Sequence, residues 1–181
     1  KKVEPAQEIK ENPETKEETV SEDSSVAKAS ADAFTLIDIR QNSYTFTVNN
    51  QKIDFHDIDQ SVVVINFFST LDSPCCGALP YLSDLQKRYK ENIFIAGVPL
   101  NDIRQNNTLK QFISKYHIDY FISNSTQNNA FATQVAKELQ LPENFAIPLT
   151  VIYKDGDYYM HYEGAVPVEM IDHDIRQVIK R

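Results

Sequence analysis

The stretch VVVINFFSTLDSPCC, residues 62–76, joins a continuous apolar run to the two cysteines of the chain. The apolar run is rich in β-branched residues, which is typical of a central strand that is buried on both faces of a sheet. The second half carries Asp72, Ser73 and Pro74 ahead of Cys75 and Cys76. Leucines at helical spacing come next, so we expect a buried strand, two adjacent thiols and then a helix.

The rest of the chain alternates short strands with amphipathic helices. Aromatic and β-branched runs predict strands at 34–39, 44–48, 51–58, 93–100 and 120–123. Apolar residues at helical spacing predict helices that begin near Leu79 and that lie within 108–118 and 128–140, and Pro167 starts a last one. Asp155-Gly156 predicts the turn of a closing hairpin. This order predicts an α/β fold, with a central mixed β-sheet flanked by helices and an N-terminal β-hairpin.

Composition divides the 181 residues into a tail and one domain. Residues 1–33 contain no aromatic residue and are rich in Glu, Lys, Ser and Thr, so we expect a disordered acidic tail. The domain is predicted to span 34–181. Because the sequence does not begin with Met, we expect a trimmed product whose leader has been removed. The tail is interpreted either as a spacer from a membrane anchor or as a plain disordered segment.

Charge and hydropathy limit the classes of partner. The formal net charge is -8, which disfavours non-specific binding to nucleic acid and to an anionic membrane surface. We find no apolar run long enough to cross a bilayer. The histidines are scattered without ligand-like spacing, and two cysteines alone do not predict a metal site. Neither a metal nor another cofactor is expected.

The motifs together resemble the thioredoxin fold, specifically the TlpA/ResA-like branch of extracytoplasmic thiol–disulfide oxidoreductases. The family's strand that leads into a Cys-x-x-Cys resembles VVVINFFSTLDSPC, and its helix-kinking proline matches Pro80, five residues after Cys75. The family's cis-proline loop resembles AIPLTVIYKDG, residues 146–156, which implies a cis Ile147–Pro148 bond. The helix-bearing segment before this loop resembles the insertion of that branch.

In this alignment, Cys75 matches the family's second, resolving cysteine, whereas Asp72 occupies the place of the first, nucleophilic cysteine. Cys76 stands where the family has Arg or Lys. The resemblance therefore implies a degenerate Asp-x-x-Cys-Cys site with Asp72, Ser73 and Pro74 in the active-site loop and Cys75 and Cys76 as the catalytic candidates. Ile147 and Pro148 are the expected substrate-binding residues. We interpret Asp72 as the N-cap of the following helix and expect Cys76 to be the more exposed thiol.

The resemblance implies a thiol–disulfide redox protein in the periplasm, or facing it from a lipoprotein anchor. Its partners would be extracytoplasmic protein clients or a membrane-bound reductant. One alternative is a non-catalytic thioredoxin-fold module that binds clients beside Pro148. Another is a peroxiredoxin-like peroxidase, in which Ser73-x-x-Cys76 plays the part of Thr/Ser-x-x-Cys. A Cys75–Cys76 disulfide is disfavoured, because adjacent Cα atoms lie about 3.8 Å apart and a normal disulfide needs about 4.4–6.8 Å.

Overall fold

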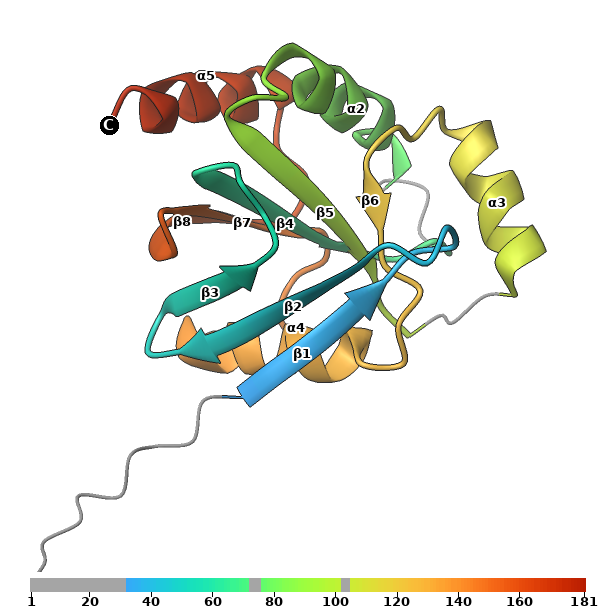
Figure 1. Ribbon diagram of the computed structural model, residues 1–181, viewed down its shortest axis with the longest axis horizontal. Helices are drawn as coiled ribbons and strands as arrows, with labels where there is room; N and C mark the ends of the chain where they lie inside the picture. Colours follow the sequence, from blue (N-terminus) through green and yellow to red (C-terminus); the bar gives the residue numbers. More distant parts are fainter. Residues whose placement is uncertain (1–31, 72–75, 102–104) are drawn as a thin grey trace, which may run out of the picture. The chain divides into compact units, whose positions relative to one another are not determined.

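The computed structural model describes residues 32–71, 76–101 and 105–181. Within these ranges it is built on a mixed sheet in the order β1-β2-β3-β8-β7-β4-β5-β6 (Figure 1). The strands are β1 (Asp32–Ile37), β2 (Ser43–Asn49), β3 (Lys52–His56), β4 (Val62–Phe68), β5 (Ile93–Pro99), β6 (Phe121–Ile122), β7 (Leu149–Lys154) and β8 (Asp157–Glu163). The helices are α2 (Leu79–Arg88), α3 (Asn106–Lys115), α4 (Asn128–Glu138) and α5 (Val168–Ile179).

The centre of the sheet is β4, all of whose residues are buried. It pairs in parallel with β5 and antiparallel with β7. Successive side chains of a strand point to opposite faces, so β4 supplies both sides of the sheet with core residues. Because both faces of β4 are buried, its sequence is a continuous apolar run and does not alternate with polar residues.

One face of the sheet is covered by α2, α3 and α5, and we call the apolar core beneath them the helical layer. β4 contributes Val62, Val64 and Phe68 to this layer. The helices contribute Leu79, Leu82, Leu85, Leu109, Phe112, Ile171, Ile175 and Val178. The spacing of these residues within each helix is the amphipathic pattern expected of helices that pack on a sheet.

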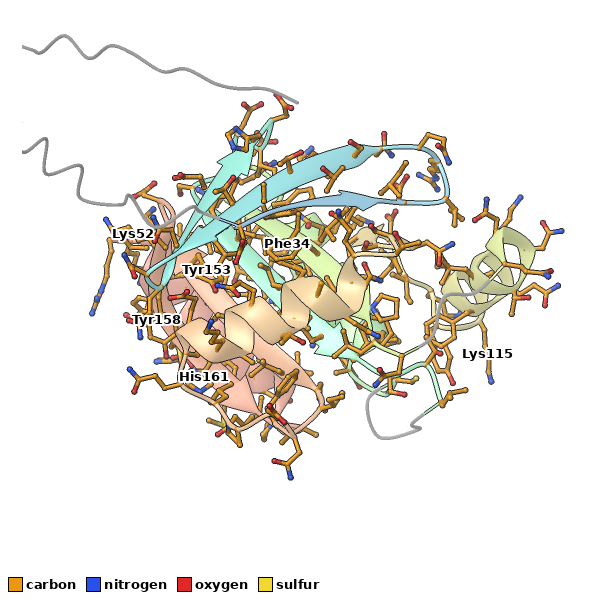
Figure 2. All side chains as sticks on the ribbon, turned by 90° about the horizontal axis from the view of Figure 1, so that it is seen from below. Phe34, Lys52, Lys115, Tyr153, Tyr158 and His161 are labelled. Carbon is orange, nitrogen blue, oxygen red and sulfur yellow. The ribbon has the colours of Figure 1, made fainter. Side chains whose placement is uncertain are left out.

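The opposite face is covered by the β1–β2 hairpin and α4, and we call its core the aromatic layer. It contains Val63, Ile65 and Phe67 of β4 with Phe46 of β2 and Phe131 of α4. Figure 2 views this face, with α4 lying across the strands and the hairpin beside it. β1 lies at the edge of the sheet, and one of its backbone carbonyls is hydrogen-bonded by the segment between β6 and α4. Oγ of Ser125 donates to the carbonyl oxygen of Thr35 (2.8 Å).

The fold class predicted from the sequence is confirmed, and the differences are at element boundaries. β1 begins at Asp32, so this strand includes two residues that the sequence analysis assigned to the tail. The helix predicted within 108–118 ends at Lys115, because His117 has a φ of 51° and leaves the helical region. The predicted hairpin turn is present, with Asp155 and Gly156 at φ of 49° and 83°. Left-handed conformations at both positions are those of a type I′ turn.

Candidate functional site

The candidate site lies at the edge of the sheet where β4 ends. The β4–β7 register pairs Phe67 with Leu149, so Pro148 adjoins the last residue of β4. The Ile147–Pro148 bond is cis, as the sequence predicted. The carbonyl of Pro148 accepts a hydrogen bond from the backbone N–H of Gly164 (2.8 Å), just beyond β8. Three strand ends and the cis-proline turn therefore meet at one edge.

Most of the predicted active-site loop lies outside the described residues. Asp72, Ser73, Pro74 and Cys75 belong to this part, so their predicted roles stay predictions. The structure describes the residues just before and just after this segment. The chain enters from β4 through Ser69 and returns at Cys76, three residues before α2 begins.

Cys76 is buried, contrary to the exposure expected from the sequence. Only 2% of its surface is accessible, and its thiol donates to the carbonyl oxygen of Ser69 (Sγ···O 3.9 Å). The physical reason is its position relative to Leu79, because residues three apart on a helical path share one face and Leu79 faces the sheet. Reactive cysteines usually lie in partly exposed surroundings. The burial therefore weighs against the peroxidase interpretation, which needs Cys76 to meet peroxide.

A buried polar pair lies on the same face of the sheet as Cys76. Nδ2 of Asn66 donates to Oγ1 of Thr150 (2.9 Å), and both residues are 4% exposed. Oδ1 of Asn66 has no hydrogen-bond partner among the described residues. The sequence analysis missed this pair, although one polar residue within the apolar run of β4 was a usable signal.

Tyr120 supplies another buried polar atom. Its hydroxyl has no hydrogen-bond partner in the part of the chain that the structure describes. Burial raises the pKa of the Tyr120 hydroxyl strongly, and the negative charge of a Cys76 thiolate raises it further. Tyr120 also packs against the apolar core that contains Cys76.

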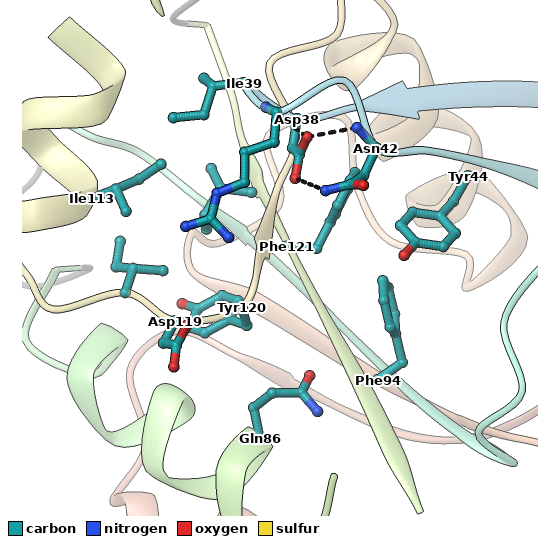
Figure 3. A pocket seen from close by; sticks show the side chains of 13 residues that line it. Asp38, Ile39, Asn42, Tyr44, Gln86, Phe94, Ile113, Asp119, Tyr120 and Phe121 are labelled. Atoms are coloured by element: carbon teal, nitrogen blue, oxygen red, sulfur yellow. Dashed lines mark hydrogen bonds between the residues drawn. The ribbon is translucent and has the colours of Figure 1, made fainter. Parts of the chain in front are cut away.

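Two grooves flank this architecture. One of about 250 Å³ adjoins the cis-proline turn and is lined by Ile147, Phe145, Leu100 and residues of α4. Another, of about 300 Å³, lies between the β1–β2 turn and β6 (Figure 3). In the second groove the carboxylate of Asp38 accepts hydrogen bonds from Asn42 and so stabilises the turn itself. Of these two grooves, the one lined by Ile147 adjoins the candidate site, because Ile147 precedes Pro148.

A family model described as Redoxin matches residues 23–173, which is most of the chain. The chain belongs to the Redoxin family. Within it, the chain is of the thioredoxin-like TlpA/ResA type, in agreement with the resemblance derived from its motifs. A thiol-disulfide oxidoreductase ResA of Bacillus thuringiensis subsp. konkukian is 23% identical over 134 residues, which cover 72% of this chain and 71% of the relative. The ResA of Oceanobacillus iheyensis is 30% identical over 74 residues, which cover 40% and 38%.

Solved structures support the fold of this Redoxin-family chain. A thiol:disulfide interchange protein from Bacteroides sp. superposes with a TM-score of 0.60 at 17% identity, covering 83% of this chain and 88% of that one. StoA from Bacillus subtilis gives a TM-score of 0.55 at 15% identity, covering 80% and 97%. A secreted Mycobacterium tuberculosis disulfide oxidoreductase gives 0.54 at 15% identity, covering 80% and 95%. At these identities the likeness establishes the fold alone.

Among residues 32–71, 76–101 and 105–181, no group of three or more His, Cys, Asp or Glu side chains could hold a metal ion. Over the same ranges, every helix is too short or too polar to cross a bilayer.

Proposed function

We propose that the protein exchanges disulfides with extracytoplasmic protein clients, or with a membrane-bound reductant, at the edge where β4 ends. Membership of the Redoxin family and the thioredoxin-like fold support this class of chemistry. The observation that carries the proposal is the position of Pro148 beside the end of β4, from which the chain runs directly into the segment with the two cysteines. One structural relative is described as secreted, which supports a location outside the cytoplasm.

The proposed chemistry uses Cys75 as the thiol that meets the client. Its thiolate attacks one sulfur of a client disulfide, forms a mixed disulfide and releases the other client sulfur as a thiolate. A thiolate of the external reductant then attacks the client sulfur of the mixed disulfide, which releases Cys75 as a thiolate and leaves the client joined to the reductant by a disulfide. An external thiol is needed because Asp72 stands in place of the family's first cysteine and a carboxylate cannot take part in disulfide exchange. The N-cap of α2 is Ala78 and not Asp72, contrary to the expectation from the sequence.

The cis-proline turn is proposed to hold the client chain during this exchange. Pro148 is buried and Ile147 is partly exposed, with the groove of about 250 Å³ beside it. An extended client segment would lie along the backbone at Ile147, and a client side chain would enter the groove, whose lining joins Leu100 and Phe145 to polar residues such as Asn129 and Asn144.

Single-thiol variants test the proposal. The full chain, Cys75→Ser and Cys76→Ser are each incubated with a peptide disulfide, and mixed disulfides are counted by intact-mass spectrometry. We expect the peptide adduct in the wild type and in Cys76→Ser and expect it to be absent from Cys75→Ser. An adduct that persists in Cys75→Ser and disappears in Cys76→Ser would overturn the assignment.

A second candidate function is a non-catalytic client-binding module, which the Asp72 substitution favours. A double variant, Cys75→Ser with Cys76→Ser, separates it from exchange chemistry. If the double variant binds a reduced or disulfide-free client as tightly as the wild type does, binding is the function of this edge. If binding needs Cys75 and a client disulfide, exchange is. Peroxide consumption that is lost only in Cys76→Ser would identify the peroxidase alternative.

A further inference from the structure

The end of α4 determines the path of the chain toward the cis-proline turn. The backbone N–H of Leu141 donates to the carbonyl of Ala136 (2.9 Å), and the N–H of Gln140 donates to the carbonyl of Lys137 (3.0 Å). Gln140 has a φ of 57° and so lies in the left-handed region. These bonds and this conformation form a Schellman motif, which satisfies the last carbonyls of a helix. The chain therefore leaves the helical path at Gln140.

Residues 141–147 run back beside α4. Leu141 lines a cavity together with Gln140, at the end of the helix. Ile147 lines a cavity together with Asn129, in the first turn of the helix. The returning segment and α4 therefore lie next to each other over most of the length of the helix.

A cavity of about 530 Å³ lies between α4 and the returning segment, and it is more than twice as large as the groove beside Ile147. Thr133, Glu143 and Phe145 line both of them, so the cavity continues the groove along the helix. We call this cavity the α4 pocket. The residues that line it and not the groove are Ala136, Lys137, Gln140, Leu141 and Pro142.

The lining of the α4 pocket suits an apolar side chain. Leu141 and Phe145 are half-buried and pack against the aromatic layer, and Ala136 is buried with a side chain too small to fill the space. The charged lining residues, Lys137 and Glu143, are exposed and opposite in sign, so together they favour neither an acidic nor a basic ligand. Removal of an apolar group from water is then the main source of affinity.

The backbone beside the groove suits an extended polypeptide. Within the part of the chain that the structure describes, Ala146 and Ile147 make no backbone hydrogen bond, since the β7 ladder begins at Leu149. Ala146 is exposed and Ile147 is partly exposed. Free N–H and C=O groups of this kind can pair with an extended peptide, whose side chains then enter adjacent cavities.

The length of the combined cavity sets the length of that peptide. The α4 residues that line the groove and the pocket run from Asn129 to Gln140, which is about 16 Å along a helix. An extended chain covers this distance in about five residues. Two side chains that are three or four residues apart can therefore enter the groove and the α4 pocket at the same time.

We propose that the α4 pocket is a second client subsite, which binds an apolar side chain three or four residues away from the one in the groove beside Ile147. The proposal rests on the proposed function, because one extended client segment spans both cavities. It also names the class of client. The segment must be unfolded over about five residues and must carry apolar side chains at this spacing, whereas its charge matters little.

Peptides with two leucines test the spacing. The full wild-type chain is titrated with fluorescent Gly/Ser peptides of twelve residues that lack cysteine, so that disulfide exchange does not contribute. Each carries two leucines, one to eight residues apart, and a peptide with one leucine is the reference. Fluorescence anisotropy should give the lowest Kd at a spacing of three or four, about tenfold below the reference, because the second leucine leaves water. A Kd that does not depend on spacing would overturn the inference.

Two variants on α4 locate the subsite. Thr133 and Ala130 are both exposed, but Thr133 lines the groove and the α4 pocket whereas Ala130 lines neither. Thr133→Phe should obstruct the junction and abolish the gain from the second leucine, whereas Ala130→Phe should keep it. Thermal melting confirms that both variants are folded. A gain that persists in Thr133→Phe, or that is lost in both variants, would contradict the assignment. A dimer in sedimentation that Thr133→Phe alone dissociates would assign the pocket to a second copy of the chain instead.

The outcome is separable from that of the proposed function, which is measured by mixed disulfides with Cys75. If these adducts form but the Kd does not depend on leucine spacing, the proposed exchange stands and the second subsite fails. If the spacing optimum is present and is lost in Thr133→Phe but no adduct forms, the subsite stands and the exchange fails.

Discussion

The two buried layers on either side of β4 differ in chemistry. The aromatic layer is filled by rings, and Phe131 lies within 5.5 Å, centroid to centroid, of Phe34, Phe46 and Phe67. The face with the helical layer also holds a thiol, an amide and a phenol, all close to the end of β4. Buried polar groups are costly unless they are paired. The comparison indicates that the aromatic layer contributes to stability through ring packing, whereas the stability of the other face also depends on how its buried polar groups are paired.

The largest expected effect comes from emptying the aromatic layer. Phe131→Ala removes a fully buried ring from between three others and should lower the free energy of unfolding by about 3–5 kcal/mol. Urea denaturation measures the loss, with Tyr81→Ala, at a side chain that is 55% exposed, as the control. A stability loss no greater than that of the control would contradict this role of the layer.

A smaller effect is expected from the polar pair on the other face. Thr150→Val removes the acceptor of Asn66 Nδ2 and leaves a buried donor unpaired, which should cost about 1–3 kcal/mol in free energy of unfolding. The double variant Asn66→Leu with Thr150→Val removes both polar groups and should recover most of that loss. Chemical denaturation of the two single variants and the double variant completes the cycle. Additive losses would show that the pair is not coupled.

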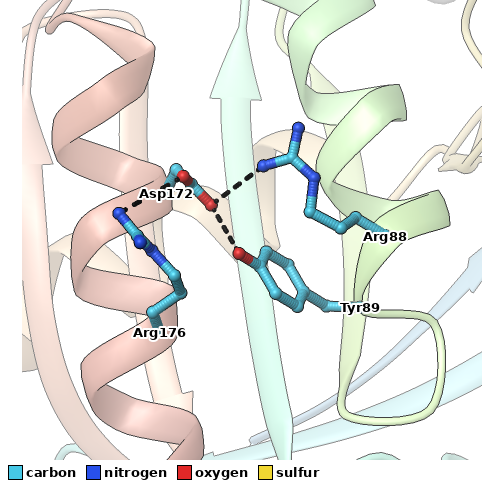
Figure 4. A network of polar contacts seen from close by, with 4 residues as sticks. All are labelled: Arg88, Tyr89, Asp172 and Arg176. Carbon is cyan, nitrogen blue, oxygen red and sulfur yellow. Dashed lines mark hydrogen bonds and ion pairs between the residues drawn. The ribbon is translucent and has the colours of Figure 1, made fainter.

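The smallest effect is expected outside both layers, in the polar network that joins α2 to α5 (Figure 4). The Tyr89 hydroxyl donates to Oδ1 of Asp172 (2.8 Å), which also faces Arg88 and Arg176. Tyr89→Phe removes one hydrogen bond at a partly exposed site, so the free energy of unfolding should fall by about 0.5–1.5 kcal/mol. Tyr81→Phe, at an exposed ring, serves as the control in the same denaturation assay. A loss above that of Thr150→Val would place more stability in this network than in the buried pair.

The fold was predictable because its signals are local. Each of three sequence patterns predicts the local structure of its own segment: the apolar run predicts β4, the leucine spacing predicts α2, and Asp155-Gly156 predicts the hairpin turn. The cis Ile147–Pro148 bond was predicted from resemblance to a known loop, and it is present. The burial of Cys76 was not predictable from neighbours in sequence, because it depends on how the turn before α2 faces the sheet. The pairing of Asn66 with Thr150 was missed because the two residues lie on β4 and β7, far apart along the chain.

The central claim is that this edge keeps a thioredoxin-like site in which Asp72 holds the place of the first cysteine. Asp72→Cys tests it most directly, since it recreates a Cys-x-x-Cys with Cys75 in the segment between β4 and α2. Reduction of insulin disulfides with a regenerating reductant should be slow in the wild type and measurably faster in Asp72→Cys. A wild type that already turns over at the rate of a dithiol reductase, or a folded Asp72→Cys that gains nothing, would contradict the account.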